Sequence, residues 1–316
     1  MRALHFDGHD LRVRNLAPPE LRPGWARLSV RLAGVCNTDL ELVKGYMGFR
    51  GVLGHEFVGV VDEGPPEWRG RRVVGEINFA CGACETCARG LSRHCPTRTV
   101  MGIQDADGAF AQSLLVPTRN LHAVPDAVSD ERAVFTEPLA AAFEILEQLE
   151  VEAGTECLVL GDGKLGLLVA QVLDLAGARV RAVGRHPEKL SILARRGIET
   201  LLADDWSPRP TELVVEATGS AAGFAAAVAA TRPRGTLVLK STVAEHPGVD
   251  LAPLVIHEIR VVGSRCGPFE PALRALAEGS VETDALIDAR LPLEQGPGAL
   301  ERARSPGALK VLIDTA

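Results

Sequence analysis

The stretch LVLGDGKLG, residues 158–166, places Gly161, Gly163 and Gly166 directly after an apolar run. The spacing G-x-G-x-x-G is weak evidence alone, because glycines recur by chance in turns. Here it follows a predicted strand and opens a predicted helix. In that context a tight turn, a close backbone approach to a pyrophosphate and close helix packing each require a missing side chain. We therefore predict a dinucleotide-binding loop, with Lys164 and Leu165 also lining the cofactor.

The region around this loop alternates short apolar runs with helix-like stretches. The runs extend from CLVLG at 157–161 to IRVVGS at 259–264, and the segments 165–177, 187–197 and 223–233 lie between them. Strands joined by crossovers of this length form a parallel, doubly wound sheet. We predict this α/β domain over residues 138–265.

The strand RVRAVG, residues 179–184, bears on which dinucleotide binds. An NAD site usually has Asp or Glu at the end of this strand, where the carboxylate accepts hydrogen bonds from the ribose hydroxyls. This sequence has Gly184 there, followed by Arg185 and, further on, Lys189. Glycine leaves room for the extra phosphate of NADP, and arginine can bind it with a charge-assisted fork. The sequence favours NADP(H) over NAD(H); the alternative is a solvent-facing Arg185 and NAD(H).

Residues 1–137 have a different pattern, with β-type runs such as WARLSVRLAGV (25–35) and GVLGHEFVGVVDEG (51–64) between glycines and prolines. This pattern predicts an antiparallel, barrel-like domain. The tail, residues 266–316, ends in the strand-like run GALKVLIDTA. We expect the tail to return to the first domain.

Four of the seven cysteines lie in CGACETCARGLSRHC, residues 81–95. Cys81, Cys84, Cys87 and Cys95 have the spacing C-x2-C-x2-C-x7-C, which suits tetrahedral zinc. An iron–sulfur cluster is the alternative, because Pro96 follows the last cysteine as in bacterial ferredoxins, although their last spacing is shorter. Four protein ligands fill a tetrahedron and exclude substrate, so this segment predicts structural zinc.

The composition limits the function classes and the location. A net charge of −7 argues against a nucleic-acid partner, because phosphate binding needs clustered Lys and Arg. No run of 18 apolar residues and no basic region followed by an apolar one is present, so we expect neither a membrane span nor a signal peptide. These features predict a cytoplasmic protein, in which clustered cysteines bind metal rather than form disulfides.

An open metal site needs three protein ligands and one exchangeable position. The remaining candidates are Cys36, His55, Glu56 and Glu137. Each has an ordinary structural explanation when taken alone: a small buried thiol, a core histidine, or an acid in the first turn of a helix.

Taken together, the motifs resemble the zinc-dependent medium-chain dehydrogenase/reductase family over essentially the whole chain. The motifs are GVCNTD, GHEFVGVV, the four-cysteine segment, TEPLA, LGDGKLG, VVEATG and LKVLID. The pattern is most similar to the polyol, sugar and threonine dehydrogenase branch, in which a Glu in an EPLA context replaces a cysteine ligand. The resemblance implies a GroES-like β-barrel catalytic domain joined to a Rossmann domain.

The resemblance also implies roles for individual residues. Cys36, His55 and Glu137 would ligate a catalytic zinc, with Glu56 as an exchangeable ligand, so that each chain would hold two zinc ions. Zinc would act as a Lewis acid while hydride passes between NADP(H) and an alcohol, a polyol or the corresponding carbonyl compound.

Further residues follow from the same resemblance. Thr38 would relay the proton, Asp39 would orient the zinc ligands, and Thr218 and Arg265 would contact the cofactor. Many relatives have a proton-relaying His where this chain has Glu41, and Glu occurs there in sugar dehydrogenase-like members; Glu41 as a surface acid is the alternative. The chain is also shorter than the usual family member, which leaves the substrate open.

Two further expectations concern activity and assembly. Relatives are homodimers or homotetramers, and we expect the same here, with a small molecule as substrate. A cofactor-binding sensor without turnover is an alternative function, but it predicts a damaged set of zinc ligands.

Overall fold

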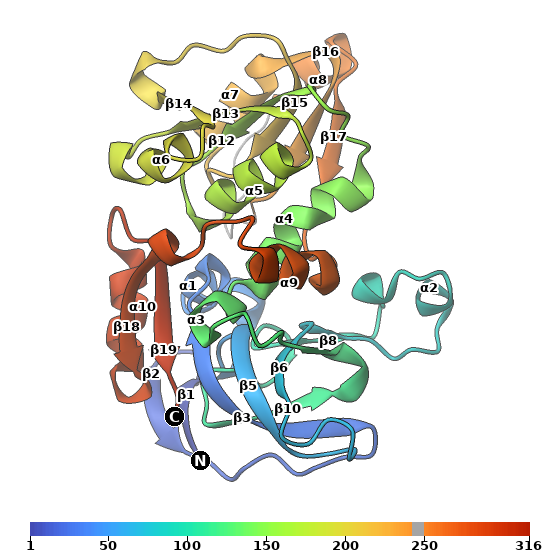
Figure 1. Cartoon of the computed structure of the whole chain (residues 1–316), viewed down its shortest axis with the longest axis vertical. Coiled ribbons are helices and arrows are strands. Elements are labelled where there is room, and N and C mark those ends of the chain that lie inside the picture. Colours follow the sequence, from blue (N-terminus) through green and yellow to red (C-terminus); the bar gives the residue numbers. More distant parts are fainter. Residues whose placement is uncertain (242–249) are drawn as a thin grey trace. The chain divides into compact units, whose positions relative to one another are not determined.

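The computed structural model describes residues 1–241 and 250–316, which form two compact units (Figure 1). The first unit contains Met1–Glu137, Ala272–Glu278 and Leu286–Ala316. The second unit contains Pro138–Pro271 and Gly279–Ala285.

Part of the tail therefore groups differently from the prediction that all of residues 266–316 return to the first unit. Hydrogen bonds hold the segment 279–285 to the second unit. Gln171 Nε2 donates to the carbonyl of Glu282 at 3.1 Å, and the N–H of Glu282 donates to Gln171 Oε1 at 2.6 Å. Arg196 also donates to the carbonyl of Ser280.

The second unit is built on a six-stranded parallel sheet in the order β14-β13-β12-β15-β16-β17. This order starts in the middle and runs outward in both directions, which is the doubly wound Rossmann topology and confirms the predicted fold class. The strands are β12 (Glu156–Leu160), β13 (Arg179–Gly184), β14 (Glu199–Leu202), β15 (Thr211–Glu216), β16 (Thr231–Leu239) and β17 (Arg260–Gly263).

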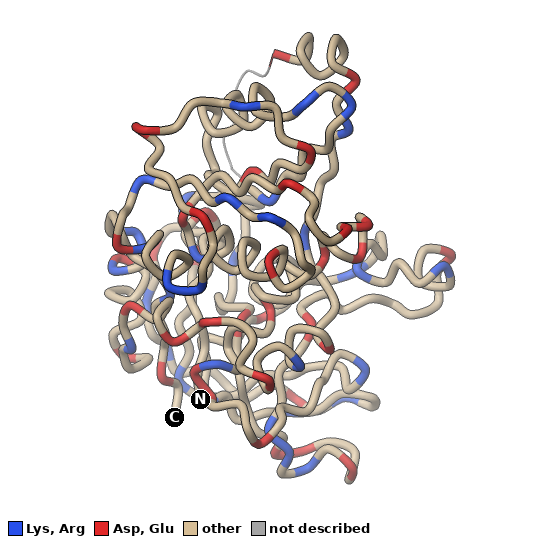
Figure 2. The backbone as a smooth tube through the Cα atoms, turned by 45° about the horizontal axis from the view of Figure 1, so that its top comes forward, with Lys and Arg blue, Asp and Glu red and all other residues tan. Residues whose placement is uncertain are grey.

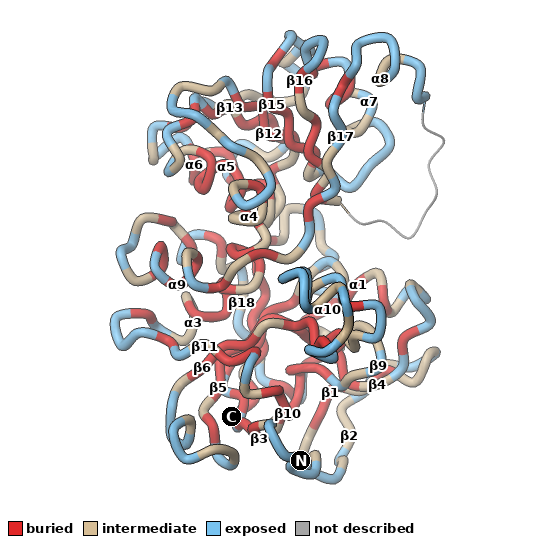
Figure 3. Tube along the Cα trace, turned by 90° about the vertical axis from the view of Figure 1, so that its right-hand side faces the viewer, coloured by how far each residue is buried: buried red, intermediate tan, exposed pale blue. Residues whose placement is uncertain are grey.

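Helices cover this sheet and follow its strands. α5 packs on β12 and β13, α6 on β13 and β14, and α7 on β15 and β16. The helices of this unit are α4 (Thr136–Gln148), α5 (Lys164–Leu175), α6 (Pro187–Ala194), α7 (Ala221–Ala230) and α8 (Ala252–Ile256). Most of α9 (Phe269–Glu278) belongs to the first unit. Figure 3 shows that the central strands are the buried layer, where Leu158, Val214 and Leu237 are each at most 2% exposed.

The first unit is mainly antiparallel. Its largest sheet has the order β11-β6-β5-β3-β19-β18, and β10 pairs with β3 outside this path. Two three-stranded sheets, β2-β1-β4 and β7-β8-β9, complete it. The strands are β1 (Arg2–Phe6), β2 (Leu11–Asn15), β3 (Trp25–Gly34), β4 (Gly51–Val52), β5 (Glu56–Glu63), β6 (Arg72–Gly75), β7 (Asn78–Phe79), β8 (Thr99–Met101), β9 (Asp105–Ala106), β10 (Ser113–Pro117), β11 (Leu121–Ala123), β18 (Ile287–Pro292) and β19 (Lys310–Asp314).

Short helices connect these strands. They are α1 (Asn37–Leu42), α2 (Glu85–Ala88), α3 (Asp130–Ala133) and α10 (Gly296–Arg304). Acidic and basic residues are interspersed along the described parts of both units (Figure 2). None of the described helices is long and apolar enough to cross a membrane.

Candidate active site

Pairing between β3 and β5 brings together three of the predicted metal ligands. The register places Gly34 opposite Glu56, so Cys36, just after β3, lies beside His55 and Glu56 at the start of β5. Ligand atoms of Cys36, His55 and Glu56 lie within 4.8 Å of one another, and the side chains of His55 and Glu56 are at most 3% exposed. A Cβ at Gly34 would lie 2.5 Å from Glu56 Oε2, so the site requires glycine there. A thiol, an imidazole and a carboxylate are the donors that zinc accepts.

Two buried polar atoms of this group lack a hydrogen-bond partner in the described part of the chain, as expected where a cation binds. His55 Nδ1 and Glu56 Oε1 are buried without a hydrogen-bond partner among the described residues. Burial lowers the pKa of His55, but the negative charges of Asp39 and Cys36 outweigh this effect and raise the pKa well above its ordinary value. A bound zinc ion would supply the partner that His55 Nδ1 and Glu56 Oε1 lack within residues 1–241 and 250–316.

Asp39 is positioned to orient this group. The carboxylate is fully buried on α1, and its Oδ2 accepts the N–H of Cys36 at 2.9 Å while its Oδ1 accepts the N–H of Gly54 at 3.2 Å. Oδ1 also lies 3.4 Å from His55 Nδ1. One side chain thus contacts both segments that carry the candidate ligands, as an orienting carboxylate must.

Lys310 is a residue of this site that the sequence analysis missed. Its Nζ forms an ion pair with Glu56 Oε2, donates to the carbonyl of Val35 at 3.4 Å and lies 5.7 Å from the ring centre of Phe135. Lys310 and Glu56 are each 1% exposed. The only signal in the sequence is a lysine inside the apolar run LKVLI, which is unusual for a buried strand.

Three other residues predicted for the active site, Glu137, Thr38 and Glu41, differ in how they relate to the group of Cys36, His55 and Glu56. Glu137, in the first turn of α4, is not one of the residues whose donor atoms lie within 4.8 Å. Thr38 Oγ1 is 3.8 Å from Cys36 Sγ, so its hydroxyl borders the group. Glu41, whose side chain is 17% exposed, accepts from Lys44 Nζ at 2.8 Å, and this lysine is 58% exposed.

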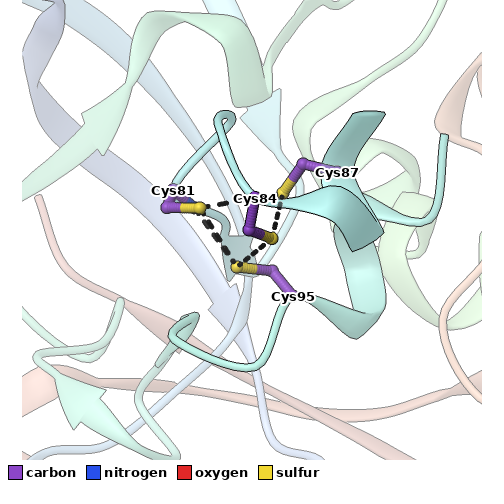
Figure 4. Close-up of side chains that lie close together, drawn as sticks. All are labelled: Cys81, Cys84, Cys87 and Cys95. Atoms are coloured by element: carbon purple, nitrogen blue, oxygen red, sulfur yellow. Dashed lines mark hydrogen bonds between the residues drawn. The ribbon is translucent and has the colours of Figure 1, made fainter. Parts of the chain in front are cut away.

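The four cysteines between β7 and β8 form a closed cluster (Figure 4). The Sγ–Sγ separations are 3.5 Å (Cys84–Cys87), 3.6 Å (Cys81–Cys95), 3.9 Å (Cys84–Cys95) and 4.0 Å (Cys81–Cys87). A tetrahedral zinc with bonds of about 2.3 Å would separate its sulfurs by about 3.8 Å. The N–H of Cys81, helped by Thr97, lowers the pKa of Cys95 to about 6, which favours the thiolate that zinc binds, whereas desolvation and the hydrogen bond with Cys84 raise the pKa of Cys87 to about 11.

The three glycines of the loop in the second unit differ in the space around them. Gly161 has φ +116°, and a Cβ there would lie 2.6 Å from the carbonyl of Ala217. A Cβ at Gly166 would lie 2.0 Å from the carbonyl of Gly161, whereas a Cβ at Gly163 would meet nothing within 4 Å. Gly163 caps α5, and Lys164 and Leu165 begin this helix, so the open space lies at a helix N-terminus, where an anion binds.

The predicted cofactor-contacting residues outside the glycine loop differ in hydrogen bonding and in exposure. Thr218 donates to Glu216 from both its N–H and its hydroxyl at 2.6 Å, so β15 holds it firmly. Arg185 and Arg265 are exposed, whereas Lys189 is only 6% exposed.

The space at Gly184 is not free. The carboxylate of Asp162, a second residue that the sequence analysis missed, fills it, and a Cβ at position 184 would lie 2.4 Å from Asp162 Oδ2. Its only signal in the sequence is an acid between the first two glycines of the loop. The prediction of NADP rested partly on room at Gly184, and that part of the argument loses its basis, whereas the part that rests on Arg185 is untouched.

Comparisons with known proteins agree with this geometry. Residues 22–126 match the model of the alcohol dehydrogenase GroES-like domain, and residues 165–278 match that of the zinc-binding dehydrogenase family. The chain is 28% identical to a sorbitol dehydrogenase of Halalkalibacterium halodurans, with 93% of each chain covered.

Two solved structures are similar over nearly the whole chain. Alcohol dehydrogenase TADH from Thermus sp. ATN1 is 30% identical with a TM-score of 0.89, and 100% of each chain is covered. A zinc-binding dehydrogenase from Sinorhizobium meliloti 1021, bound to NADP, is 28% identical with a TM-score of 0.89, covering 99% of this chain and 98% of the other. The chain belongs to the zinc-dependent medium-chain dehydrogenase/reductase family, in the branch that contains polyol dehydrogenases.

Proposed function

We propose that this protein transfers hydride between a nicotinamide cofactor and a small alcohol or polyol, or the corresponding carbonyl compound. Oxidoreductase chemistry on CH–OH groups is common to its named relatives. The observation that carries the proposal is the group of half-buried Cys36 and buried His55 and Glu56, which Asp39 and Lys310 contact. Its donor atoms fit zinc and leave at least one position for a substrate oxygen.

The residues of the group have distinct proposed roles. Cys36 and His55 would hold the zinc, with Glu137 as third ligand and Glu56 as exchangeable ligand. Bound there, zinc supplies a Lewis acid that favours an alkoxide over an alcohol. Thr38, next to Cys36 Sγ, is placed to hold the substrate proton at Oγ1, and Glu41 lies one turn further along α1.

The cofactor would bind at the glycine loop, with its pyrophosphate at the N-terminus of α5. Arg185, exposed directly after β13, supports NADP(H), whereas the carboxylate of Asp162 in the space at Gly184 supports NAD(H).

A screen with both cofactors tests the function. Polyols, aldoses, threonine and secondary alcohols are offered to the zinc-loaded protein for oxidation, and the corresponding carbonyl compounds for reduction. We expect turnover that His55→Ala abolishes without loss of the folded state. Nucleotide binding without turnover across the screen would instead support the sensor.

We further propose two zinc ions per chain, one in each ligand group. Elemental analysis should find about two zinc ions, as expected for one closed and one open site. Cys87→Ser should lower this number to about one and lower the melting temperature, because the cysteine segment depends on metal for its fold. Ser92→Ala, an exposed change in the same segment, is the matched control. A wild-type content near one would mean that one site is misassigned.

We also propose that the protein is a homodimer or homotetramer. β17 is the last strand of its sheet, and β17 and the nearby α8 expose large apolar side chains. The exposed fractions are 61% for Leu251, 75% for Val255, 72% for Ile256 and 41% for Val261. Exposed apolar surface of this kind supports pairing between copies.

A further inference from the structure

Asp162 lies in the glycine loop, but its carboxylate reaches the end of the neighbouring strand, β13. Oδ2 accepts hydrogen bonds from the N–H of Arg185 at 2.6 Å and the N–H of His186 at 2.7 Å, and lies 3.0 Å from His186 Nδ1. These contacts fix the carboxylate at the turn between β13 and α6. Burial would raise the pKa of Asp162, but the hydrogen bonds from His186 and Arg185 outweigh burial and lower it, so the group is ionised at neutral pH.

The position of this carboxylate excludes a side chain on β13. A Cβ at Gly184 would lie 2.4 Å from Oδ2, 2.5 Å from Cβ and 2.6 Å from Cγ of Asp162. One carboxylate can therefore occupy this place, either from residue 184 or from residue 162. The chain has glycine at one position and aspartate at the other.

Asp162 also keeps one oxygen available. Oδ1 accepts no hydrogen bond from the part of the chain that the structure describes, and Asp162 as a whole is 8% exposed. A carboxylate at the end of this strand is the group that binds the ribose hydroxyls of NAD, and it repels a phosphate on the same ribose.

We propose that Asp162 replaces the missing strand-end acid, accepts hydrogen bonds from the adenosine ribose and makes the protein select NAD(H) over NADP(H). The proposal rests on the nicotinamide site of the proposed function. The exposed positive charge of Arg185 acts against this selection, because it would attract the 2′-phosphate of NADP(H). However, the exposed guanidinium of Arg185 is screened by water, whereas the carboxylate of Asp162 is nearly buried.

Binding measurements without substrate test the assignment. Titration calorimetry compares two pairs of ligands, NADH with NADPH and ADP-ribose with 2′-phospho-ADP-ribose. In each pair the ratio of dissociation constants gives the preference for the ligand that lacks the 2′-phosphate. We expect the wild-type protein to bind the ligand without the 2′-phosphate at least tenfold more tightly. Asp162→Asn, whose amide oxygen can keep an N–H partner, should reduce that preference at least tenfold. Glu188→Gln is the control, because it removes one exposed charge from α6 without touching Gly184.

Moving the carboxylate from residue 162 to residue 184 controls for a variant that loses the preference only because it misfolds. Asp162→Gly alone should lose the preference, and Asp162→Gly with Gly184→Asp should restore it, since the acid then comes from β13. A wild-type preference for NADPH, or equal shifts in Asp162→Asn and Glu188→Gln, would overturn the assignment while leaving the proposed function standing. Wild type that binds none of the four ligands would overturn the proposed function and this assignment with it.

Discussion

Lys310 is the buried residue on which the state of Glu56 depends. Both side chains are 1% exposed, so in the zinc-free protein removing the lysine leaves the Glu56 carboxylate without water and without its paired charge. We predict that Lys310→Met lowers the free energy of unfolding by about 3–5 kcal/mol, measured by denaturant titration.

Two controls distinguish this effect from a general loss of charge. Glu56→Gln combined with Lys310→Met should recover most of the stability, because no buried charge remains unpaired. Lys44→Met, in the exposed pair with Glu41, should cost less than about 1 kcal/mol. Equal costs for Lys310→Met and Lys44→Met would contradict the prediction.

Asp39 acts on the metal group through the ligands that it holds. We predict that Asp39→Asn, which retains only one oxygen acceptor, lowers zinc affinity at the Cys36–His55 site by about 10- to 100-fold. Competition with a chelator measures this affinity. Asp62→Asn, at a carboxylate bonded to Ser29 on the exposed side of the same sheet, should leave it unchanged. Unchanged zinc affinity in Asp39→Asn would remove the orienting role.

The sequence could identify the residues of this site that have local motifs but not those that act across long separations. Cys36, His55 and Glu56 lie in short motifs, and antiparallel pairing of β3 with β5 brings them together. Lys310 is 254 positions from Glu56, and nothing near either residue indicates the pair. Asp162 was missed because only the structure shows that it occupies the place of a side chain on a different strand.

At the scale of elements, the glycines of the loop between β12 and α5 have different tasks. We predict that Gly166→Ala destabilises the second unit by about 1–3 kcal/mol, because its Cβ would lie 2.0 Å from the Gly161 carbonyl. Gly163→Ala should keep wild-type stability, since its φ of −73° suits alanine and its Cβ meets nothing.

Thermal unfolding and nucleotide titration together separate the two tasks. In Gly163→Ala the melting temperature should stay at the wild-type value while NADH binding weakens, because the methyl group occupies the space where the pyrophosphate would approach. Full NADH affinity in Gly163→Ala would place the nucleotide elsewhere.

The alternation of apolar runs predicted the elements of the second unit well, and its main error has a local cause. The sequence suggested a helix over 223–233, but α7 ends at Ala230 and β16 begins at Thr231. Pro233 cannot donate a helical hydrogen bond, and Arg234 has φ +59°, so the chain leaves the helix early. The partition of the tail could not be predicted, because it depends on hydrogen bonds such as that between Gln171 and Glu282.

At the scale of the whole molecule, the exposed face of α8 and β17 predicts the oligomer. Light scattering after size-exclusion chromatography should give the mass of a dimer or tetramer, and Val255→Asp with Val261→Asp should reduce it, because buried charges oppose association. Leu175→Asp, at a residue on α5 that is 42% exposed, is the control. A monomeric wild type would contradict this prediction.

The place of β19 has a consequence for biosynthesis. β19 lies inside the largest sheet of the first unit, between β3 and β18, and carries Lys310. The ribosome makes this strand only after the second unit, so the second unit can fold while the first still lacks a central strand and the counter-charge of Glu56. A nascent chain that stops before residue 310 therefore exposes an unfinished sheet to chaperones and proteases, even though every candidate zinc ligand has already been synthesised.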